Sequence, residues 1–213
     1  MNLIELSKIY VKTDKEQLHS YFSRVYEDIL APHKIYFKKI CEIGVGDYDC
    51  LRIFKNYFKN AELLGLDITN DNRQLEDRIF LEHFDQSNKE IVEEKSKKMT
   101  EYDLIIDDGS HVMFDQQITF CNFFNNSLKS KGIFIIEDLH TSLYVLNDLN
   151  KHVYYGDKNE ITTLDLLKNF NDTGKINSDF LSKEECSILE NNIEKIMIFD
   201  ELNESVVAVI YKK

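Results

Sequence analysis

Short apolar runs alternate with amphipathic segments along most of the chain, and this alternation predicts a sheet covered by helices. The apolar runs read as strands buried on both faces, and the segments between them carry apolar residues at helical spacing. Units of this kind form parallel sheets with right-handed crossovers. Strands are predicted at 39–44, 61–66, 79–81, 104–106 and 133–136, with helices at 49–59, 89–99 and 114–128.

The C-terminal part departs from this alternation. After helices predicted near 163–170 and 182–193, two apolar runs at 196–199 and 206–211 are separated only by 200–205. This linker is too short for a helical crossover, so the two runs are expected to form an antiparallel hairpin. The predicted fold class is therefore α/β, a doubly wound, Rossmann-like and mostly parallel seven-stranded sheet, with five parallel strands and a C-terminal antiparallel hairpin.

Length and composition fit one α/β domain with extra segments. Of the 213 residues, 43% are hydrophobic, which is enough for a core, and the single proline and seven glycines argue against long flexible linkers. We expect an N-terminal helical segment at 1–37 and an α/β domain at 38–213, with a loop or lid around 139–194. In the first segment, Thr13 and Glu16 have capping-box spacing at the start of a helix expected to run unbroken almost to the proline.

Charge and cysteine spacing exclude several classes of protein. The net charge of -12 argues against a nucleic-acid partner or an anionic membrane surface, whereas an acidic cleft suits a divalent cation. The four cysteines show no Cys-x-x-Cys spacing, so we expect reduced thiols without disulfides or zinc. The N-terminus has no secretory apolar region, and no apolar run is long enough to span a bilayer. We therefore expect a cytoplasmic protein.

A glycine loop and acidic residues at three strand ends suggest the cofactor. Gly44 and Gly46 follow the first strand, where glycines let the backbone approach a ligand, although Gly-x-Gly also occurs in ordinary turns. Glu42 and other acids near this loop would repel a pyrophosphate but suit an ammonium group. Asp67 follows the second strand, where an acid can accept both ribose hydroxyls, and Asp85 follows the third, within reach of an adenine amino group. S-adenosylmethionine has these groups and no phosphate, so it is the expected cofactor.

The fourth and fifth strands both end in paired carboxylates. Asp107 and Asp108 follow one, Glu137 and Asp138 follow the other, and neighbouring strands bring all four together. Protons or a cation must relieve their repulsion, and oxygen ligands favour a hard cation, with Mg²⁺ first and Ca²⁺ or Mn²⁺ as alternatives. Successive strand residues point to opposite faces, so Glu137 and Asp138 can both be ligands only if the strand has already ended. Asp107 could equally face the cofactor.

His111 follows Asp108 across a Gly-Ser turn and is the candidate general base. A neutral imidazole suits this role, and general-base help is typically worth about 10²–10⁴ in rate. A metal with open positions would chelate two adjacent acceptor hydroxyls and lower the pKa of one of them. Asp108 and His111 are therefore the catalytic candidates. His140 and Thr141 follow the fifth strand and could contact the acceptor, while a capping or loop role for His140 fits equally well.

Several stretches spread over most of the chain carry a resemblance to a known family. They are residues 13–15 with His19 and Tyr21, and stretches 42–46, 65–68, 85–87, 106–111 and 136–142. In these the chain resembles class I S-adenosylmethionine-dependent methyltransferases. More narrowly, it resembles the macrocin O-methyltransferase family, which methylates sugar hydroxyls in antibiotic and polysaccharide pathways. The Asp-Asp-Gly-Ser-His and Glu-Asp-Leu-His-Thr-Ser pieces are specific, whereas the glycine loop is not.

The resemblance adds roles that spacing alone does not give. It also marks one departure, because Tyr48 and Asp49 stand where the family usually has further glycines. Relatives in the family are often oligomers, which makes a homo-oligomer an expectation from resemblance. The residues given a role in this way are Asp108, Glu137 and Asp138 as metal ligands, Gln86 beside the cofactor, and His19 and Tyr21 beside the acceptor.

The expected function is a metal-dependent O-methyltransferase. It would transfer a methyl group from S-adenosylmethionine to a hydroxyl of a sugar or sugar-nucleotide, in polysaccharide or natural-product biosynthesis. An amine, a phenol or a phosphorylated small molecule is the alternative acceptor. A non-catalytic cofactor-binding subunit is the alternative of another class, and a pure binder has no need of the set formed by Asp108, His111, Glu137 and Asp138.

Overall fold

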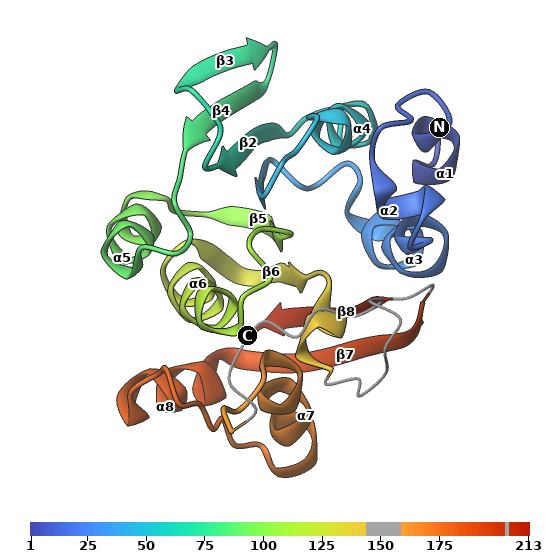
Figure 1. The fold of residues 1–213 in the computed structure, drawn as a ribbon. Helices are drawn as coiled ribbons and strands as arrows, with labels where there is room; N and C mark the ends of the chain where they lie inside the picture. Colours follow the sequence, from blue (N-terminus) through green and yellow to red (C-terminus); the bar gives the residue numbers. More distant parts are fainter. Residues whose placement is uncertain (144–158, 203–204) are drawn as a thin grey trace, which may run out of the picture.

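A computed structural model describes residues 1–143, 159–202 and 205–213 and contains a mixed eight-stranded sheet (Figure 1). Its strands are β1 (Lys39–Ile43), β2 (Glu62–Asp67), β3 (Arg73–Glu76), β4 (Ile79–His83), β5 (Tyr102–Asp107), β6 (Leu128–Ile136), β7 (Ile193–Leu202) and β8 (Ser205–Lys212). Their order in the sheet is β3-β4-β2-β1-β5-β6-β8-β7. Five strands, β1, β2, β4, β5 and β6, run parallel, and β8 lies antiparallel to both β6 and β7.

The predicted fold class is confirmed, and the predicted strand count is wrong by one edge strand. All five parallel strands and the C-terminal hairpin are present. The additional strand, β3, has one apolar residue, Leu75, and therefore lacks the pattern of a buried strand. It pairs antiparallel with β4 at the sheet edge, and a register shift between Gln74 and Glu76 interrupts the pairing.

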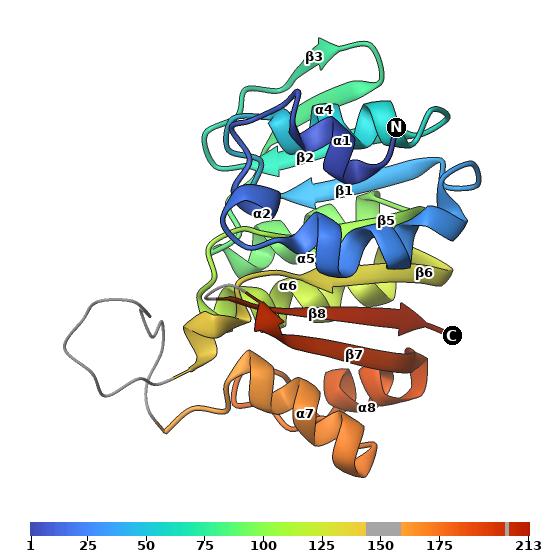
Figure 2. The same ribbon diagram turned by 90° about the vertical axis from the view of Figure 1, so that its right-hand side faces the viewer.

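Two groups of helices cover the two faces of the sheet (Figure 1, Figure 2). Alternate residues of each strand face opposite sides, and in β5 Leu104 and Ile106 join one apolar cluster while Ile105 joins the other. The helices on the first side are α1 (Leu3–Ser7), α2 (Asp14–Gln17), a π-helical turn (Phe22–Tyr26), α3 (Glu27–Leu30), a 3₁₀ turn (Ala31–His33) and α4 (Asp49–Tyr57). Those on the second side are α5 (Lys89–Lys98), α6 (Met113–Asn126), α7 (Thr163–Thr173) and α8 (Lys183–Asn192).

The N-terminal segment is helical only in pieces, so the prediction of an unbroken second helix is wrong. Ser20 has a left-handed backbone (φ 59°), which separates α2 from the π-helical turn and α3. The predicted capping box is also absent, because the Thr13 side chain accepts from the N–H of Lys15 and Glu16 instead accepts from the N–H of Ser23. The break leaves α2 as a short turn beside the tip of β1 (Figure 2).

The sheet has a topological switch point between β1 and β5. The chain moves outward from β1 to β2 and β4, then returns to the other side of β1 to form β5 and β6. Ligands of open α/β sheets bind outside the carboxyl ends of the strands at such a point. The predicted lid begins with a 3₁₀ turn, Leu139–Ser142, and residues 144–158 of it lie outside the described part.

Two smaller observations concern the cysteines and the helices. All four cysteines are buried, and none is paired in a disulfide. Across the described ranges, no helix combines the length and the apolar character needed to cross a membrane.

Candidate active site

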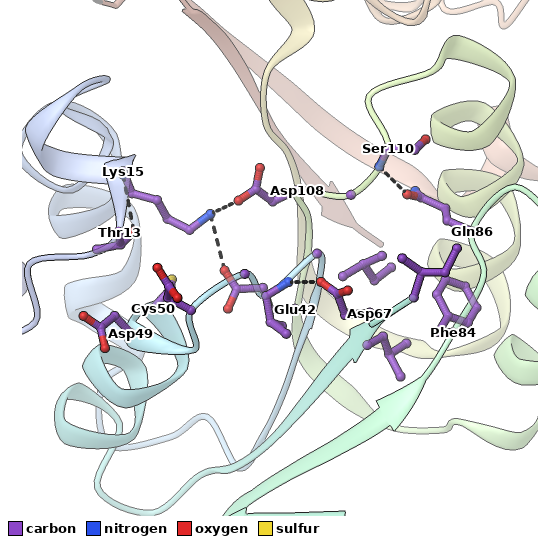
Figure 3. Close-up of a pocket in the computed structure, with 18 of the residues that line it drawn as sticks. Thr13, Lys15, Glu42, Asp49, Cys50, Asp67, Phe84, Gln86, Asp108 and Ser110 are labelled. Carbon is purple, nitrogen blue, oxygen red and sulfur yellow. Dashed lines mark hydrogen bonds and ion pairs between the residues drawn. The ribbon is translucent and has the colours of Figure 1, made fainter. Parts of the chain in front are cut away.

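A cavity of about 520 Å³ opens at the carboxyl ends of β1, β2 and β4 (Figure 3). Its volume lies in the range of small-molecule and cofactor sites. The glycine loop after β1 forms part of its wall, and the predicted cofactor residues other than Asp107 line it. These residues are Glu42, Gly44, Gly46, Asp67, Asp85 and Gln86.

Gly44 is the point at which the glycine loop packs against the end of β5. Its φ is +78°, and a Cβ at this position would lie 1.9 Å from the carbonyl oxygen of Asp108. The N–H of Asp108 in turn donates to the carbonyl oxygen of Ile43 at 2.8 Å. Gly46 also has a positive φ, +45°, but has open space around it. The contact with Asp108 therefore requires glycine at position 44 for two reasons, conformation and space.

Tyr48 takes the left-handed backbone conformation that a glycine would adopt without strain. It precedes α4 with φ 67°. The next residue, Asp49, uses its carboxylate to accept from the N–H of Lys12 at 3.1 Å and from Arg52 at 3.2 Å. The departure from the family's glycines thus leaves the turn in place and ties it to the N-terminal segment.

Asp67 is fixed in the cavity wall by the backbone around it. One carboxylate oxygen accepts from the N–H of Val45 at 2.9 Å, and the other from the N–H and the hydroxyl of Thr69 at 2.9 and 2.8 Å. Burial opposes ionisation, but these hydrogen bonds hold the pKa of Asp67 below its usual value. Asp67 is therefore a preorganised, ionised acceptor.

Asp107 lies behind the cavity wall and apart from the other carboxylates. Its Oδ1 accepts from Gln86 Nε2 at 2.8 Å, and Gln86 Oε1 accepts from the N–H of Ser110 at 2.8 Å. Burial raises the pKa of Asp107 to about 7. Gly109 packs so closely that a Cβ there would lie 2.0 Å from Gln86 Oε1. Asp107 and Gln86 together brace the turn that carries Asp108.

The carboxylates of Glu42, Asp108, Glu137 and Asp138 form an acidic cluster. This cluster contains a lysine, Lys15, that the sequence did not lead us to expect. The Lys15 ammonium lies 2.5 Å from Asp108 Oδ2 and 3.3 Å from Glu42 Oε1 (Figure 3). It also lies 2.7 Å from Glu137 Oε2. The Tyr26 hydroxyl donates to the other oxygen of Glu137. Burial would lower the pKa of Lys15, but the carboxylates of Asp108 and Glu137 raise it well above the usual value. Lys15 is therefore a buried ammonium ion.

Two buried carboxylates, Glu42 and Glu137, and the partly buried Asp108 surround one ammonium and leave an excess of negative charge. Burial raises the pKa of Glu42, Asp108 and Glu137, and Lys15 opposes this rise in each case. Glu42 is 1% exposed, yet neither of its oxygens has a hydrogen-bond partner in the described part of the chain. Buried polar atoms are normally paired, so this end of the cavity is suited to a cationic group.

A second group of potential ligands lies on the outer side of Asp108. Asp108, His111 and Asp138 bring one ligand atom each to within 4.8 Å of the others. His111 Nε2 lies 3.5 Å from Asp138 Oδ2 and 3.9 Å from Asp108 Oδ1. Carboxylate and imidazole ligands together fit a divalent cation. The two oxygens of Asp108 therefore face two different cation positions, one of which holds Lys15.

The end of β6 divides the predicted metal ligands between these two positions. The strand ends at Ile136, and Asp138 has a left-handed backbone (φ 53°). As a result Asp138 turns toward His111, whereas Glu137 turns inward to Lys15. Glu137 and Asp138 both follow the strand, but their side chains have different partners.

The residues predicted to contact the acceptor gather around Asp138. The Tyr21 hydroxyl donates to Asp138 Oδ1 at 2.7 Å and lies 2.5 Å from the hydroxyl of Ser205. Ser205 also lies 3.1 Å from His140 Nδ1. The His19 ring stacks on Tyr21, with 5.0 Å between ring centroids, and its Nε2 is 4.0 Å from Asp138. Two histidines and a tyrosine thus surround one carboxylate.

Thr141 is buried and connects the two turns that carry His111 and Asp138. Its hydroxyl lies 3.1 Å from the carbonyl oxygen of His111 and 3.0 Å from that of Asp138.

Burial opposes ionisation of Asp138, but His111 and hydrogen bonds from Tyr21 and Ser205 hold its pKa below the usual value. His111 Nδ1 is buried and has no hydrogen-bond partner among the described residues. Asp138 is an ionised neighbour for the candidate base.

Sequence reasoning missed Lys15, Tyr26 and Ser205. Position 15 lies inside a stretch that carries the family resemblance, and this was the one signal available for it. Tyr26 and Ser205 read as ordinary helix and strand residues. Their contacts join residues 111 and 184 positions apart in the chain, to Glu137 and Tyr21 respectively.

Comparison with known proteins identifies relatives of one kind. No family model matches the chain. It is 32% identical over 139 residues to the 8-demethyl-8-alpha-L-rhamnosyl tetracenomycin-C 2'-O-methyltransferase of Streptomyces olivaceus. This match covers 62% of this chain and 36% of that protein. The chain is 27% identical over 183 residues to the demethylmacrocin O-methyltransferase of Streptomyces fradiae, covering 81% of this chain and 44% of that protein. The relatives of this chain are sugar O-methyltransferases. The chain spans less than half the length of these relatives.

A solved structure of the same kind shares the fold over the whole chain. MycE, a methyltransferase of the mycinamycin biosynthetic pathway solved in complex with Mg and SAH, is 26% identical with a TM-score of 0.76. The match covers 100% of this chain and 53% of MycE. The predicted resemblance to S-adenosylmethionine-dependent sugar O-methyltransferases is thereby confirmed.

Proposed function

We propose that this chain transfers a methyl group from S-adenosylmethionine to a sugar hydroxyl with the help of a divalent cation. The observation that carries the proposal is the cavity at the switch point, which adjoins the group formed by Asp108, His111 and Asp138. The names of the relatives support a sugar acceptor, and the Mg and SAH bound by MycE support the cofactor and the metal.

The cavity offers a matching partner for each polar part of the cofactor. Asp67 is ionised and would accept the ribose hydroxyls, and Asp85 would face the adenine amino group. Glu42, one oxygen of which is 3.3 Å from Lys15, would accept the ammonium group through its other oxygen. When bound, S-adenosylmethionine supplies the electrophilic methyl group on its sulfonium. Gly44 and Gly46 keep the loop free of side chains beside this position.

The acidic cluster would hold the cation and the acceptor. Asp108 and Asp138 would be ligands, with Glu137 as the further oxygen ligand expected from the sequence. When bound, a hard divalent cation lowers the pKa of a coordinated hydroxyl. His111 would take the hydroxyl proton at Nε2, where the carboxylates of Asp138 and Asp108, 3.5 and 3.9 Å away, stabilise the imidazolium. Tyr21 would orient Asp138 through its hydrogen bond.

The direct test is methyl transfer to a deoxysugar glycoside, such as an O-rhamnosyl compound. With S-adenosylmethionine and Mg²⁺, we expect a methylated product and SAH in equal amounts, and we expect EDTA to stop the reaction and excess Mg²⁺ to restore it. A phenol and an amine serve as comparison acceptors. Full activity in EDTA would remove the cation from the proposal, and calorimetry that detects no SAH binding would reject the proposal as a whole.

A further inference from the structure

Lys15 lies where two predicted metal ligands come together. Its ammonium is within hydrogen-bond distance of both Asp108 and Glu137, at 2.5 and 2.7 Å, and forms an ion pair with Glu42 at 3.3 Å. An ammonium has three N–H donors and no acceptor, and here it faces three carboxylates. The side chain is 2% exposed, so water competes little for these contacts. The inner side of the cluster thus holds a cation that belongs to the chain itself.

Both oxygens of Glu137 already have a partner while Lys15 is in place. One of its oxygens accepts from Lys15, and the other accepts from the Tyr26 hydroxyl. Asp108 is shared in a similar way, with Oδ2 on Lys15 and Oδ1 facing His111. A divalent cation that binds Glu137 competes with the ammonium for this carboxylate, and one that binds only on the outer side of Asp108 lies close to a positive charge. In either arrangement the two cations oppose each other.

The surroundings of Lys15 give the ammonium a place to move. Lysine carries a compact charge on a flexible stem, and the cavity lies directly beside this one, with both Lys15 and Glu42 in its wall (Figure 3). A small rotation of the stem would leave the ammonium paired with Glu42 and free Asp108 and Glu137. The helix that carries Lys15, α2, has only four residues, Asp14–Gln17.

We propose that Lys15 is an internal counter-ion that competes with the divalent cation for Asp108 and Glu137 and so sets the affinity of the acidic cluster for that cation. In the absence of metal it offsets the repulsion among the buried carboxylates. The inference rests on the divalent cation of the proposed function. It assigns Lys15 a positioning role, since Lys15 acts through Asp108 and Glu137.

The test is a titration of the full chain with MgCl₂ alone, followed by calorimetry, for wild type, Lys15→Met and Lys12→Met. Methionine keeps the length of the stem without its charge. We expect Lys15→Met to bind Mg²⁺ about tenfold tighter than wild type or more, because a buried competing charge is gone. Lys12 is the matched control, since it is 66% exposed and pairs with Asp47 at 3.9 Å, and its loss should change the Kd by about twofold or less because solvent screens it.

The outcomes separate the inference from the proposed function. An equal or weaker Mg²⁺ affinity in Lys15→Met overturns the inference alone. If neither wild type nor Lys15→Met binds Mg²⁺, the cation part of the proposed function fails and the inference fails with it.

Two further measurements cover the case in which Lys15→Met is unstable without metal. We expect Mg²⁺ to raise its Tm by more than it raises that of wild type, and a variant that stays unfolded in saturating Mg²⁺ overturns the inference. In wild type, the ¹⁵N resonance of Lys15 Nζ should shift as Mg²⁺ is added. A resonance that does not move at saturating Mg²⁺ overturns it as well.

Discussion

The cofactor cavity and the acidic cluster meet at the carboxyl ends of the parallel strands, but they are built in different ways. The cavity wall is held by contacts within one turn, such as Asp67 with Thr69, and by contacts between successive strand ends, such as Asp67 with Val45, 22 positions apart. The cluster is formed by side chains from distant segments, such as Lys15 and Glu137, which are 122 positions apart. A site of the first kind can be read from local patterns, whereas a site of the second kind depends on how the whole chain packs.

The largest expected effect is a loss of methyl transfer in the acidic cluster without a loss of cofactor binding in the cavity. His111 does not line the cavity, so His111→Ala should lower the methylation rate by about 10²–10⁴ and leave the affinity for SAH unchanged. Single-turnover kinetics and calorimetry with SAH measure the two effects. His83→Ala, at the exposed end of β4, is the control and should change neither. A parallel loss of SAH affinity in His111→Ala would show that the cofactor cavity and the acidic cluster act as one site.

The next largest effect concerns the contact between Gly44 and Asp108, which joins the cofactor cavity to the acidic cluster. Gly44→Ala should lower the free energy of unfolding by about 3 kcal/mol, because its Cβ would overlap the Asp108 carbonyl and its φ is positive. Gly46→Ala has the conformational cost without the overlap and should lose only about 1 kcal/mol. Urea unfolding measures both. Equal losses would mean that the loop is free to move away from β5.

The smallest effect tests whether Asp107 is buried behind the cavity wall. Its pKa is about 7 in the folded chain and about 3.9 when unfolded, so the folded chain binds more protons in that window and stability falls as pH rises through it. From pH 5 to pH 8, Asp107→Asn should gain about 2 kcal/mol of stability relative to wild type. Urea unfolding in EDTA at both values measures the gain. Asp172→Asn, at an exposed carboxylate, is the control, and an equal gain there would contradict the assignment.

The same contrast explains how much the sequence predicted. Apolar runs such as 104–106 predicted the buried strands, whereas β3 was missed because Arg-Gln-Leu-Glu carries no such pattern. Acids at strand ends predicted Asp67 and Asp85 in the cavity wall, since strand ends share one edge of the sheet. The place of Lys15 depends on the left-handed break at Ser20, and such a conformation in a serine leaves no mark in the sequence pattern.

The contact between Tyr21 and Ser205 joins residues 184 positions apart, and it makes completion of the cluster depend on the C-terminal hairpin. Tyr21 precedes the first strand of the sheet, and Ser205 begins β8. The cavity is lined by residues that all precede α6, but Asp138 accepts a hydrogen bond from Ser205 only when the C-terminal hairpin is part of the sheet. The catalytic cluster therefore needs the C-terminal hairpin in place, whereas the cavity needs no residue of that hairpin in its wall.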